Sequence, residues 1–272
     1  MPSSFGLWFG AYAETLVDDV RLLAAAYAIA DQNPLGSAAG YGSSFPLNRT
    51  MTTELLGFST LHYNVVAAQM SRGKTERAIA AALSAIAATL GRFAMDVCLF
   101  MCQNFAFISF PDELTTGSSI MPHKKNPDVF EIMRAKCNRL QSLPNEVALM
   151  TTNLPLGYQR DFQLLKDALF PAFGQLSGCL QLCDFMLQHI RVRRDILDDP
   201  RYDYLFTVED VNRLVLDGTP FREAYKAVGH AVQNGTYSPT RTVSHTHEGS
   251  IGNLCTEAIR QKFDDVFAPF RQ

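Results

Sequence analysis

The sequence has no excess of positive charge. Lysine and arginine together number 24 against 27 aspartates and glutamates, and the formal net charge is -3. Because non-specific binding to nucleic acid needs a broad basic surface, this balance argues against nucleic acid as the main partner. The short basic run at 191–194, Arg-Val-Arg-Arg, is better explained as the solvated end of a helix.

The cysteines lack the two-residue spacing of zinc knuckles and redox motifs. Six are present, and the pairs Cys98/Cys102 and Cys179/Cys183 are each four residues apart within apolar helical patterns. We therefore expect reduced thiols in a core and, by default, a cytoplasmic protein. Residues 245–248, His-Thr-His-Glu, suggest a metal site, but no second ligand cluster accompanies them and we expect no metal.

Long uncharged apolar runs are also scarce. We expect no membrane-spanning segment, because charges at Asp18, Asp19, Arg92 and Asp96 interrupt the apolar stretches. We expect no signal peptide either, because a basic region followed by an apolar one does not open the chain. With 47% hydrophobic and 19% charged residues, the 272-residue sequence is typical of a globular protein with a substantial core.

Helix-forming sequence dominates what is present, and strand signals are few. Apolar periodicity with start and stop signals predicts long helices at about 5–30, 52–70, 75–104, 127–150 and 161–191, and shorter ones at about 207–217 and 220–233. We therefore expect an all-α protein in two parts. Residues 1–197 would form a long five-helix bundle with a loop at 115–127, and residues 198–272 a small C-terminal helical domain.

The long helices carry Ala- and Leu-rich faces around most of their circumference. Such faces need more cover than a single layer of five helices supplies. We therefore expect the bundle to associate with copies of itself, as a homotetramer with a shared helical core.

The loop at 117–127, Gly-Ser-Ser-Ile-Met-Pro-His-Lys-Lys-Asn-Pro, has almost nothing to bury. Its glycine, serines and prolines disfavour regular structure, while Asn126, Pro127 and Asp128 form a helix-start signal. A mobile loop thus leads into a helix N-terminus, where amide dipoles and two lysines favour an anion.

Ser118 and Lys124 suit a loop that closes over a small anionic substrate and excludes water. A serine beside cations loses its proton more readily, and lysine or amide donors hold the charge that develops on a carboxylate next to a deprotonated carbon. These are the requirements of a β-elimination. The alternative is a surface loop whose serines cap a helix and whose lysines are solvated.

The order of residues in 117–127 resembles the signature loop of the fumarase/aspartase superfamily of lyases. Residues 154–167, Leu-Pro-Leu-Gly-Tyr-Gln-Arg-Asp-Phe-Gln-Leu-Leu-Lys-Asp, resemble the segment of the argininosuccinate lyase branch that carries its substrate-binding Tyr, Gln and Lys. Residues 218–224, Gly-Thr-Pro-Phe-Arg-Glu-Ala, are similar to the C-terminal domain of that branch. The likeness covers essentially the whole chain, as the central and C-terminal part of such an enzyme.

This resemblance implies a small-molecule substrate and a reaction of arginine biosynthesis, the reversible cleavage of argininosuccinate to arginine and fumarate, with no metal or organic cofactor. It implies proton transfer at the succinyl Cβ by Ser118, and stabilisation of the aci-carboxylate intermediate by Lys124 and Asn126. The full set of implied residues is catalytic Ser118, Lys124 and Glu131, and substrate-binding Ser119, Asn126, Tyr158, Gln163 and Lys166. The spacing of Gln163 and Lys166 also predicts that they share one helix face, with Tyr158 in the turn before it.

Glu131 has a role in the family that depends on another residue. There, the carboxylate at this place orients a histidine in an upstream Thr-x-His segment, and none of the six histidines here has that context. The chain is therefore expected to be truncated, without the family's N-terminal domain, and inactive alone. The simpler interpretation of Glu131 is a favourable charge near a helix N-terminus.

Two other functions stay open. A sister lyase such as adenylosuccinate lyase shares the loop and the Arg160-Asp161 pair, but fits the spacing of Tyr158, Gln163 and Lys166 less well. A non-catalytic helical assembly of the same fold is the second alternative.

Overall fold

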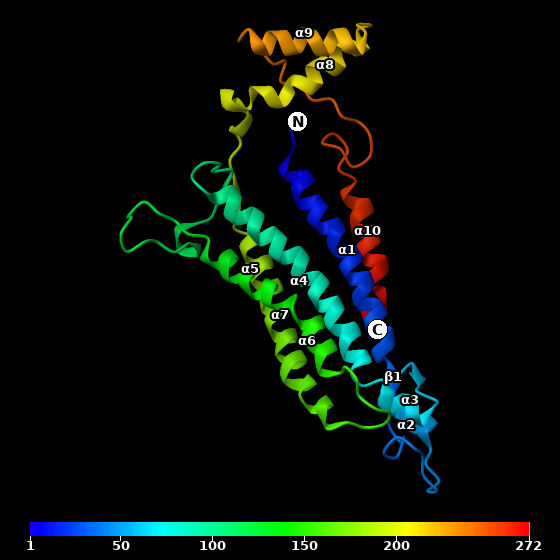
Figure 1. Cartoon of the computed structure of the whole chain (residues 1–272). Coiled ribbons are helices and arrows are strands. Elements are labelled where there is room, and N and C mark those ends of the chain that lie inside the picture. Colours follow the sequence, from blue (N-terminus) through cyan, green and yellow to red (C-terminus); the bar gives the residue numbers. More distant parts are fainter. Residues whose placement is uncertain (272) are drawn as a thin grey trace.

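The computed structural model describes residues 1–271 and consists mainly of helices that run along one long axis (Figure 1). The main helices are α1 (Phe5–Ala30), α4 (Lys74–Met101), α5 (Asp128–Leu140), α6 (Leu143–Met150) and α7 (Leu165–Leu187). Helices α1 and α4 are antiparallel. Helices α5 and α6 follow one another and run antiparallel to α4, and α7 runs in the same direction as α4. The expectation of an all-α fold is confirmed.

The bundle has two ends, which we call upper and lower as in Figure 1. The upper end holds the start of α1, the end of α4, the loop at 115–127 and the end of α7. The lower end holds α2 (Arg49–Leu56), α3 (Val65–Met70), the connection 151–164 and the start of α7.

Within residues 1–271 the strands form one short pair at each end. At the lower end β1 (Gln32–Asn33) pairs in parallel with β2 (Thr60–Leu61). At the upper end β3 (Ile108–Ser109) pairs antiparallel with β4 (Arg191–Val192).

Local signals account for the helices that the sequence predicted well. Ser4 caps α1, its Oγ accepting a hydrogen bond from the Leu7 amide at 3.1 Å, and α1 has the expected bounds. Glu76 closes the start of α4, because its Oε2 accepts from the Gly73 amide at 2.6 Å. The short helices α8 (Thr207–Leu216) and α9 (Phe221–Gln233) also lie where they were expected.

The prediction of one helix at 52–70 is wrong. Gly57 ends α2 in the left-handed conformation with φ 73°, and Asn64 caps α3 by accepting hydrogen bonds from the amides of Val66 and Ala67. Between the two helices, β2 pairs with β1, which this chain can do only if the helix is interrupted.

The prediction of one helix at 127–150 is wrong as well. The helical segment is interrupted between α5 and α6 at Gln141 and Ser142, and Pro144 lies in the first turn of α6. Proline is tolerated there because the first amides of a helix have no helical partner.

The last long helix starts later than predicted. Arg160–Gln163 forms a separate 3-10 turn, and α7 begins at Leu165. Gln163 and Lys166 therefore do not share one α-helical face, as their spacing had suggested. The other 3-10 turns are Asp112–Leu114, Ile196–Asp198, Pro200–Phe206 and Ala268–Arg271.

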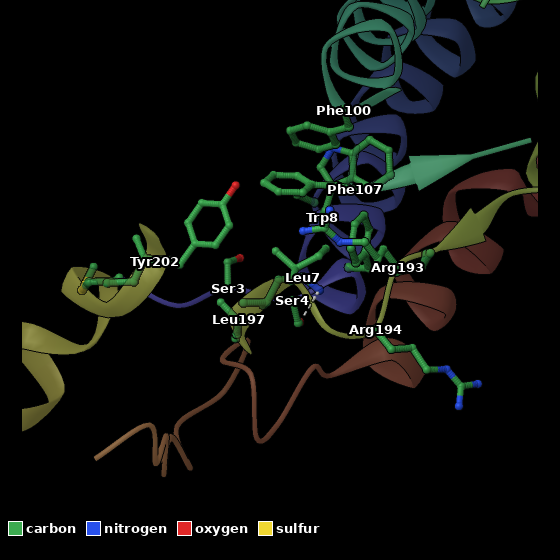
Figure 2. Close-up of a pocket in the computed structure, with 16 residues that line it drawn as sticks. Ser3, Ser4, Leu7, Trp8, Phe100, Phe107, Arg193, Arg194, Leu197 and Tyr202 are labelled. Atoms are coloured by element: carbon green, nitrogen blue, oxygen red, sulfur yellow. Dashed lines mark hydrogen bonds between the residues drawn. The ribbon is translucent and has the colours of Figure 1, made fainter. Parts of the chain in front are cut away.

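An apolar cavity of about 690 Å³ lies at the upper end (Figure 2). Aromatic residues from both α1 and α4 and from the segments that follow line it, chiefly Trp8, Phe100, Phe107 and Tyr202. Trp8 is fixed there by two contacts: its Nε1 donates to Asp96 Oδ2 at 3.0 Å, and its ring stacks on Phe93 with centroids 5.1 Å apart.

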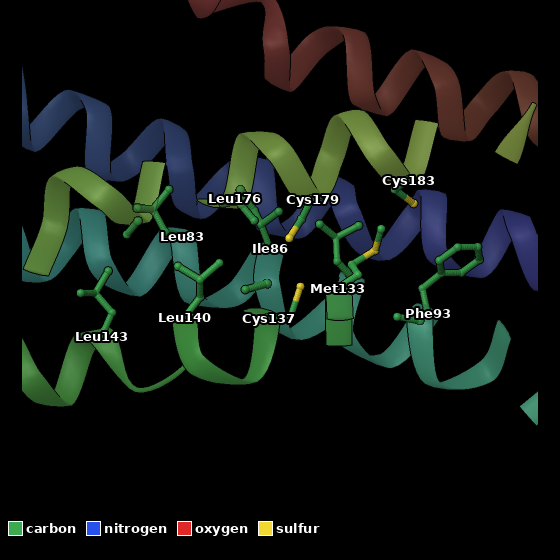
Figure 3. Packing of buried hydrophobic residues seen from close by; sticks show 14 of the residues in the cluster. Leu83, Ile86, Phe93, Met133, Cys137, Leu140, Leu143, Leu176, Cys179 and Cys183 are labelled. Atoms are coloured by element: carbon green, nitrogen blue, oxygen red, sulfur yellow. The ribbon is translucent and has the colours of Figure 1, made fainter. Parts of the chain in front are cut away.

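The core is centred on α4, which packs against α1, α5, α6 and α7. Figure 3 shows side chains of α4 packing between those of α5 and α7. They include Leu83 and Ile86 on α4, Met133 and Leu140 on α5, and Leu176 on α7. Gly91 lets α5 approach α4 closely, since a Cβ at Gly91 would stand 3.2 Å from the Cβ of Cys137. Burial of apolar surface of this extent is the main stabilising contribution to the fold.

By length and composition alone, α4 also qualifies as a helix that can cross a membrane. The charges at Arg92 and Asp96 had led us to expect no such segment. More than half of its most apolar window, 56%, is buried against the rest of the protein, as in the core helix of a bundle.

After the bundle, α8 and α9 pack on each other through a small core of their own, formed by Val211, Ala224 and Val228. The chain then returns to the bundle, where α10 (Thr256–Phe267), which the sequence did not predict, lies along α1 (Figure 1). The division into domains at residue 197 remains a prediction.

Candidate active site

The loop at 117–126 is closed at its base. Thr116 and Asn126 form an isolated bridge, with the Asn126 amide donating to the Thr116 carbonyl at 2.8 Å and the Thr116 amide donating back at 3.2 Å. Beyond this bridge the loop extends away from the bundle into solvent, and Ile120 near its tip is 87% exposed.

Ser118 has a defined environment within the exposed loop. Its Oγ accepts hydrogen bonds from the Ile120 amide at 3.2 Å and the Met121 amide at 3.0 Å. Two amide donors stabilise negative charge on an oxygen, and the hydroxyl proton stays free to be given away. This arrangement favours proton transfer through Ser118.

The two loop lysines differ in their contacts. Lys125 forms an ion pair with Asp112 in the preceding 3-10 turn. Lys124 is exposed and pairs with no carboxylate in residues 1–271, so its charge is available to an anion. Asn126 donates weakly to the Gly117 carbonyl at 3.4 Å, and Ser119 is exposed.

Glu131 lies in the first turn of α5, directly after the loop, and its side chain is exposed. Its place near a helix N-terminus is favourable for a carboxylate. Ser118, Ser119, Lys124, Asn126 and Glu131 thus all belong to the upper end.

Tyr158, Gln163 and Lys166 lie at the lower end. Gln163 Nε2 donates to the Tyr158 hydroxyl at 2.6 Å, so these two predicted residues are in direct contact. Gly157, with φ 93°, precedes them in a left-handed conformation that favours glycine, and a Cβ there would come within 2.9 Å of the Tyr41 hydroxyl.

Lys166 lines a cavity of about 350 Å³ at the start of α7. The polar residues that share this cavity are Arg72, in the turn before α4, and Thr75 and Glu76, in the first turn of α4. These three residues were not among those predicted from the sequence. A signal was available, because Arg72 and Glu76 are four residues apart around a glycine that starts a helix, the spacing of a stabilising ion pair.

The two groups of predicted residues do not meet in one chain. β3 leads to the 117–126 loop and pairs with β4, which follows the end of α7, whereas Gln163 and Lys166 lie at the start of α7. With 23 residues in α7, a rise of about 1.5 Å per residue separates the groups by about 35 Å. Each chain therefore carries the two groups of predicted residues at opposite ends.

No group of three or more His, Cys, Asp or Glu side chains suited to a metal ion occurs in residues 1–271. Of the His-Thr-His-Glu segment, His245 bonds through Nε2 to Glu209 Oε1 at 2.9 Å, which ties the connection before α10 to α8.

The helical bundle with its projecting loop has the fold of fumarase-type lyases. A class II fumarase from Schistosoma mansoni superposes with a TM-score of 0.73 at 16% identity, covering 100% of this chain and 58% of the fumarase. A family profile described as lyase matches residues 1–142, and the chain belongs to this family.

Particular relatives are much closer in sequence. The chain is 60% identical over 270 residues to a protein named argininosuccinate lyase from Parabacteroides distasonis, covering 99% of this chain and 60% of the relative. It is 61% identical over 259 residues to the protein of that name from Bacteroides fragilis, covering 95% of this chain and 58% of the relative. The chain therefore spans about three fifths of the length of these relatives.

Proposed function

We propose that this chain forms the central and C-terminal part of an argininosuccinate lyase, which cleaves L-argininosuccinate to L-arginine and fumarate. The observation that carries the proposal is the 117–126 loop, where two amides hold Ser118 Oγ and Lys124 has no anionic partner among the described residues. The chain that bears this loop is 60% identical to a protein named for that reaction.

In the proposed reaction Ser118 Oγ takes a proton from the Cβ of the succinyl group. The electron pair moves into the adjacent carboxylate, and Lys124 with Asn126 holds the aci-carboxylate that results. Collapse of this intermediate forms the double bond of fumarate and breaks the bond to the guanidino nitrogen. The released nitrogen takes up a proton from an acid, which the family resemblance makes a histidine oriented by Glu131.

Tyr158, Gln163 and Lys166 would bind the remainder of the substrate. Because they lie about 35 Å from the loop within one chain, a complete site needs the upper end of one copy beside the lower end of another. We propose a homotetramer in which antiparallel bundles bring the two halves together. The enzyme would act in the cytoplasm on a small-molecule substrate, and the reaction would need no metal or organic cofactor.

The experiment follows fumarate formation from argininosuccinate by the complete, assembled protein and its Ser118→Ala variant. We expect turnover to fall by about a hundredfold or more, the loss typical of a proton-transfer group. Ser142→Ala is the matched control, because Ser142 is exposed and its hydroxyl donates only to the Arg139 carbonyl, at 2.8 Å. Unchanged turnover in Ser118→Ala would remove Ser118 from the mechanism.

The same assay separates the alternatives. Cleavage of adenylosuccinate instead of argininosuccinate would identify the sister lyase, and no cleavage of either would favour a non-catalytic assembly. For the 272-residue chain alone we expect negligible activity, restored in part by a partner that supplies the Thr-x-His segment. Full activity of the chain alone would contradict the assigned mechanism.

A further inference from the structure

Arg72 lies in the turn between α3 and α4 and is held firmly on one side. Its Nε donates to Glu76 Oε1 at 2.8 Å, and Glu76 Oε2 accepts from the Gly73 amide at 2.6 Å. The Glu76 side chain is only 14% exposed, so this is a partly buried ion pair in which the carboxylate is anchored by the backbone.

On its other side Arg72 reaches a residue 90 positions further along the chain. Its Nη2 donates to the Phe162 carbonyl at 3.3 Å, and its guanidinium lies 5.6 Å from the centroid of the Phe162 ring. Phe162 is 5% exposed and forms part of the main core. Two contacts to one residue fix both the backbone and the side chain of the 3-10 turn at 160–163.

That turn lies between Tyr158 and Lys166 and includes Gln163, the three residues of the lower half of the proposed site. The Tyr158 ring packs edge-on against Phe162 with centroids 6.4 Å apart, and Gln163, the next residue, donates to the Tyr158 hydroxyl. Lys166 shares a cavity with Arg72 and Glu76. A continuous set of contacts therefore runs from Glu76 through Arg72 and Phe162 to Tyr158 and Gln163.

The charges in the cavity also depend on Arg72. Glu76 is neutralised by Arg72, which leaves the Lys166 ammonium as the free charge facing a substrate carboxylate. Without Arg72, Glu76 loses its cationic partner in the cavity that it shares with Lys166, and a pair between Glu76 and Lys166 would weaken the attraction for an anion.

We propose that Arg72, held by Glu76, is a positioning residue for the substrate-binding group Tyr158, Gln163 and Lys166. The proposal rests on the lyase function proposed above. Arginine suits the role because its planar fork donates to a carboxylate and a carbonyl while its face covers a ring, which a lysine ammonium cannot do.

The test combines two measurements on the complete, assembled protein. Hydrogen exchange without substrate reports whether the amides of residues 158–166 are held, and steady-state kinetics with argininosuccinate report KM and kcat separately. The variants are Arg72→Met, Arg72→Lys and Glu76→Gln. Arg92→Met is the control, because Arg92 is an exposed arginine on α4 that does not line this cavity and forms no hydrogen bond or ion pair within residues 1–271.

We expect Arg72→Met to speed exchange at 158–166 and to raise KM about tenfold while kcat stays within about threefold, as for loss of binding that substrate and transition state share equally. Glu76→Gln changes both quantities in the same direction, Arg72→Lys recovers part of each, and Arg92→Met changes neither. A purely structural role would lower the melting temperature without moving KM.

Each contrary result has a distinct meaning. Unchanged exchange in a folded Arg72→Met protein overturns the positioning role, and if KM still rises, Arg72 contacts the substrate directly. Faster exchange with unchanged KM overturns it as well. Absence of activity in the unmodified protein contradicts the proposed lyase function instead, and is told apart because the exchange measurement needs no substrate.

Discussion

The six cysteines differ in burial, and burial determines the pKa of a thiol and so its reactivity. Cys137, Cys179 and Cys183 are buried where α5 meets α7 (Figure 3), whereas Cys98, Cys102 and Cys255 are partly exposed. Burial, reinforced by the neighbouring cysteines, raises the pKa of the Cys137 thiol to about 12, and burial raises the pKa of Cys183 to about 11. Both therefore stay protonated at neutral pH.

A first prediction concerns thiol titration. In the folded protein at pH 8 we expect a disulfide reagent to modify at most the three partly exposed cysteines, and in denaturant all six. The reason is that the thiolate is the reactive form and that the core excludes the reagent. Rapid modification of Cys137 without denaturant would contradict the packing of α5 on α7.

Asp210 on α8 is a buried carboxylate that depends on hydrogen bonds. Burial by itself raises its pKa, but donors from Thr240 and from the Tyr237 hydroxyl, the latter at 2.7 Å, together with Arg213, outweigh burial and lower the pKa overall. A group whose folded pKa is lowered stabilises the fold above its unfolded pKa, and this stabilisation is lost as pH falls through the folded value.

We therefore predict that Asp210→Asn destabilises the α8–α9 unit at pH 7, by about 1–3 kcal/mol for loss of charged hydrogen bonds in a buried place. The difference from the unmodified protein should shrink towards zero as pH falls below about 4, the unfolded pKa of aspartate. Free energies of opening from amide exchange in α8 and α9 measure this. A difference independent of pH would show that the charge of Asp210 is not what matters.

At the scale of elements, the sequence predicted helices well where caps and periodicity agree, as at Ser4 for α1. The prediction failed where a residue interrupts a pattern that is otherwise compatible with one long helix. Gly57 ends α2, and Pro144 lies in the first turn of the separate helix α6. Both were visible in the sequence, but the pairing of β1 with β2 that makes the break at Gly57 necessary is a contact between distant segments.

The candidate residues could be picked from the sequence through resemblance, but their arrangement could not. Ser118 and Lys124 lie in the same region because they are only six residues apart in one short loop. Ser118 and Gln163 are far apart because they lie at opposite ends of the helical bundle, and this distance depends on the tertiary fold. Arg72 was missed since its contact with Phe162 joins positions 90 residues apart.

The 117–125 loop itself carries a prediction. Among the described residues, the contacts that restrain it are the bridge at Thr116 and Asn126, the side-chain contacts of Ser118, Asn126 and Lys125, and one hydrogen bond within the loop, from the Lys124 amide to the Met121 carbonyl at 3.0 Å. Without ligand we expect fast amide exchange or high crystallographic B-factors in this segment, and protection when a substrate analogue binds. Equal protection with and without the analogue would exclude loop closure.

At the scale of the whole molecule, large apolar side chains remain exposed along the bundle. On α7 these are Phe170, Phe173, Leu180, Leu182 and Phe185, all at least 41% exposed. Gly174 and Gly178 lie among them with open space where a side chain would be. A surface of this kind is typical of a protein that buries it against another chain.

We predict that the protein forms a tetramer at micromolar concentration, and that Phe173→Glu weakens it because a charge would have to be buried at the interface. Light scattering or sedimentation measures the change. Val208→Glu on α8 is a control of equal charge, since Val208 is likewise exposed but lies outside the bundle. A folded monomer of the unmodified protein would contradict both the tetramer and the composite site.

The chain has a single tryptophan, Trp8, and its surroundings make it an optical reporter. Its indole is hydrogen-bonded to Asp96, stacked on Phe93 and set in the wall of the upper cavity. Intrinsic emission excited at the red edge therefore comes from one end of the molecule only. A spectral shift on assembly would show that the upper end becomes covered. In a chain that does not assemble, binding confined to Tyr158 and Lys166, about a helix length of 35 Å away, would leave the spectrum unchanged.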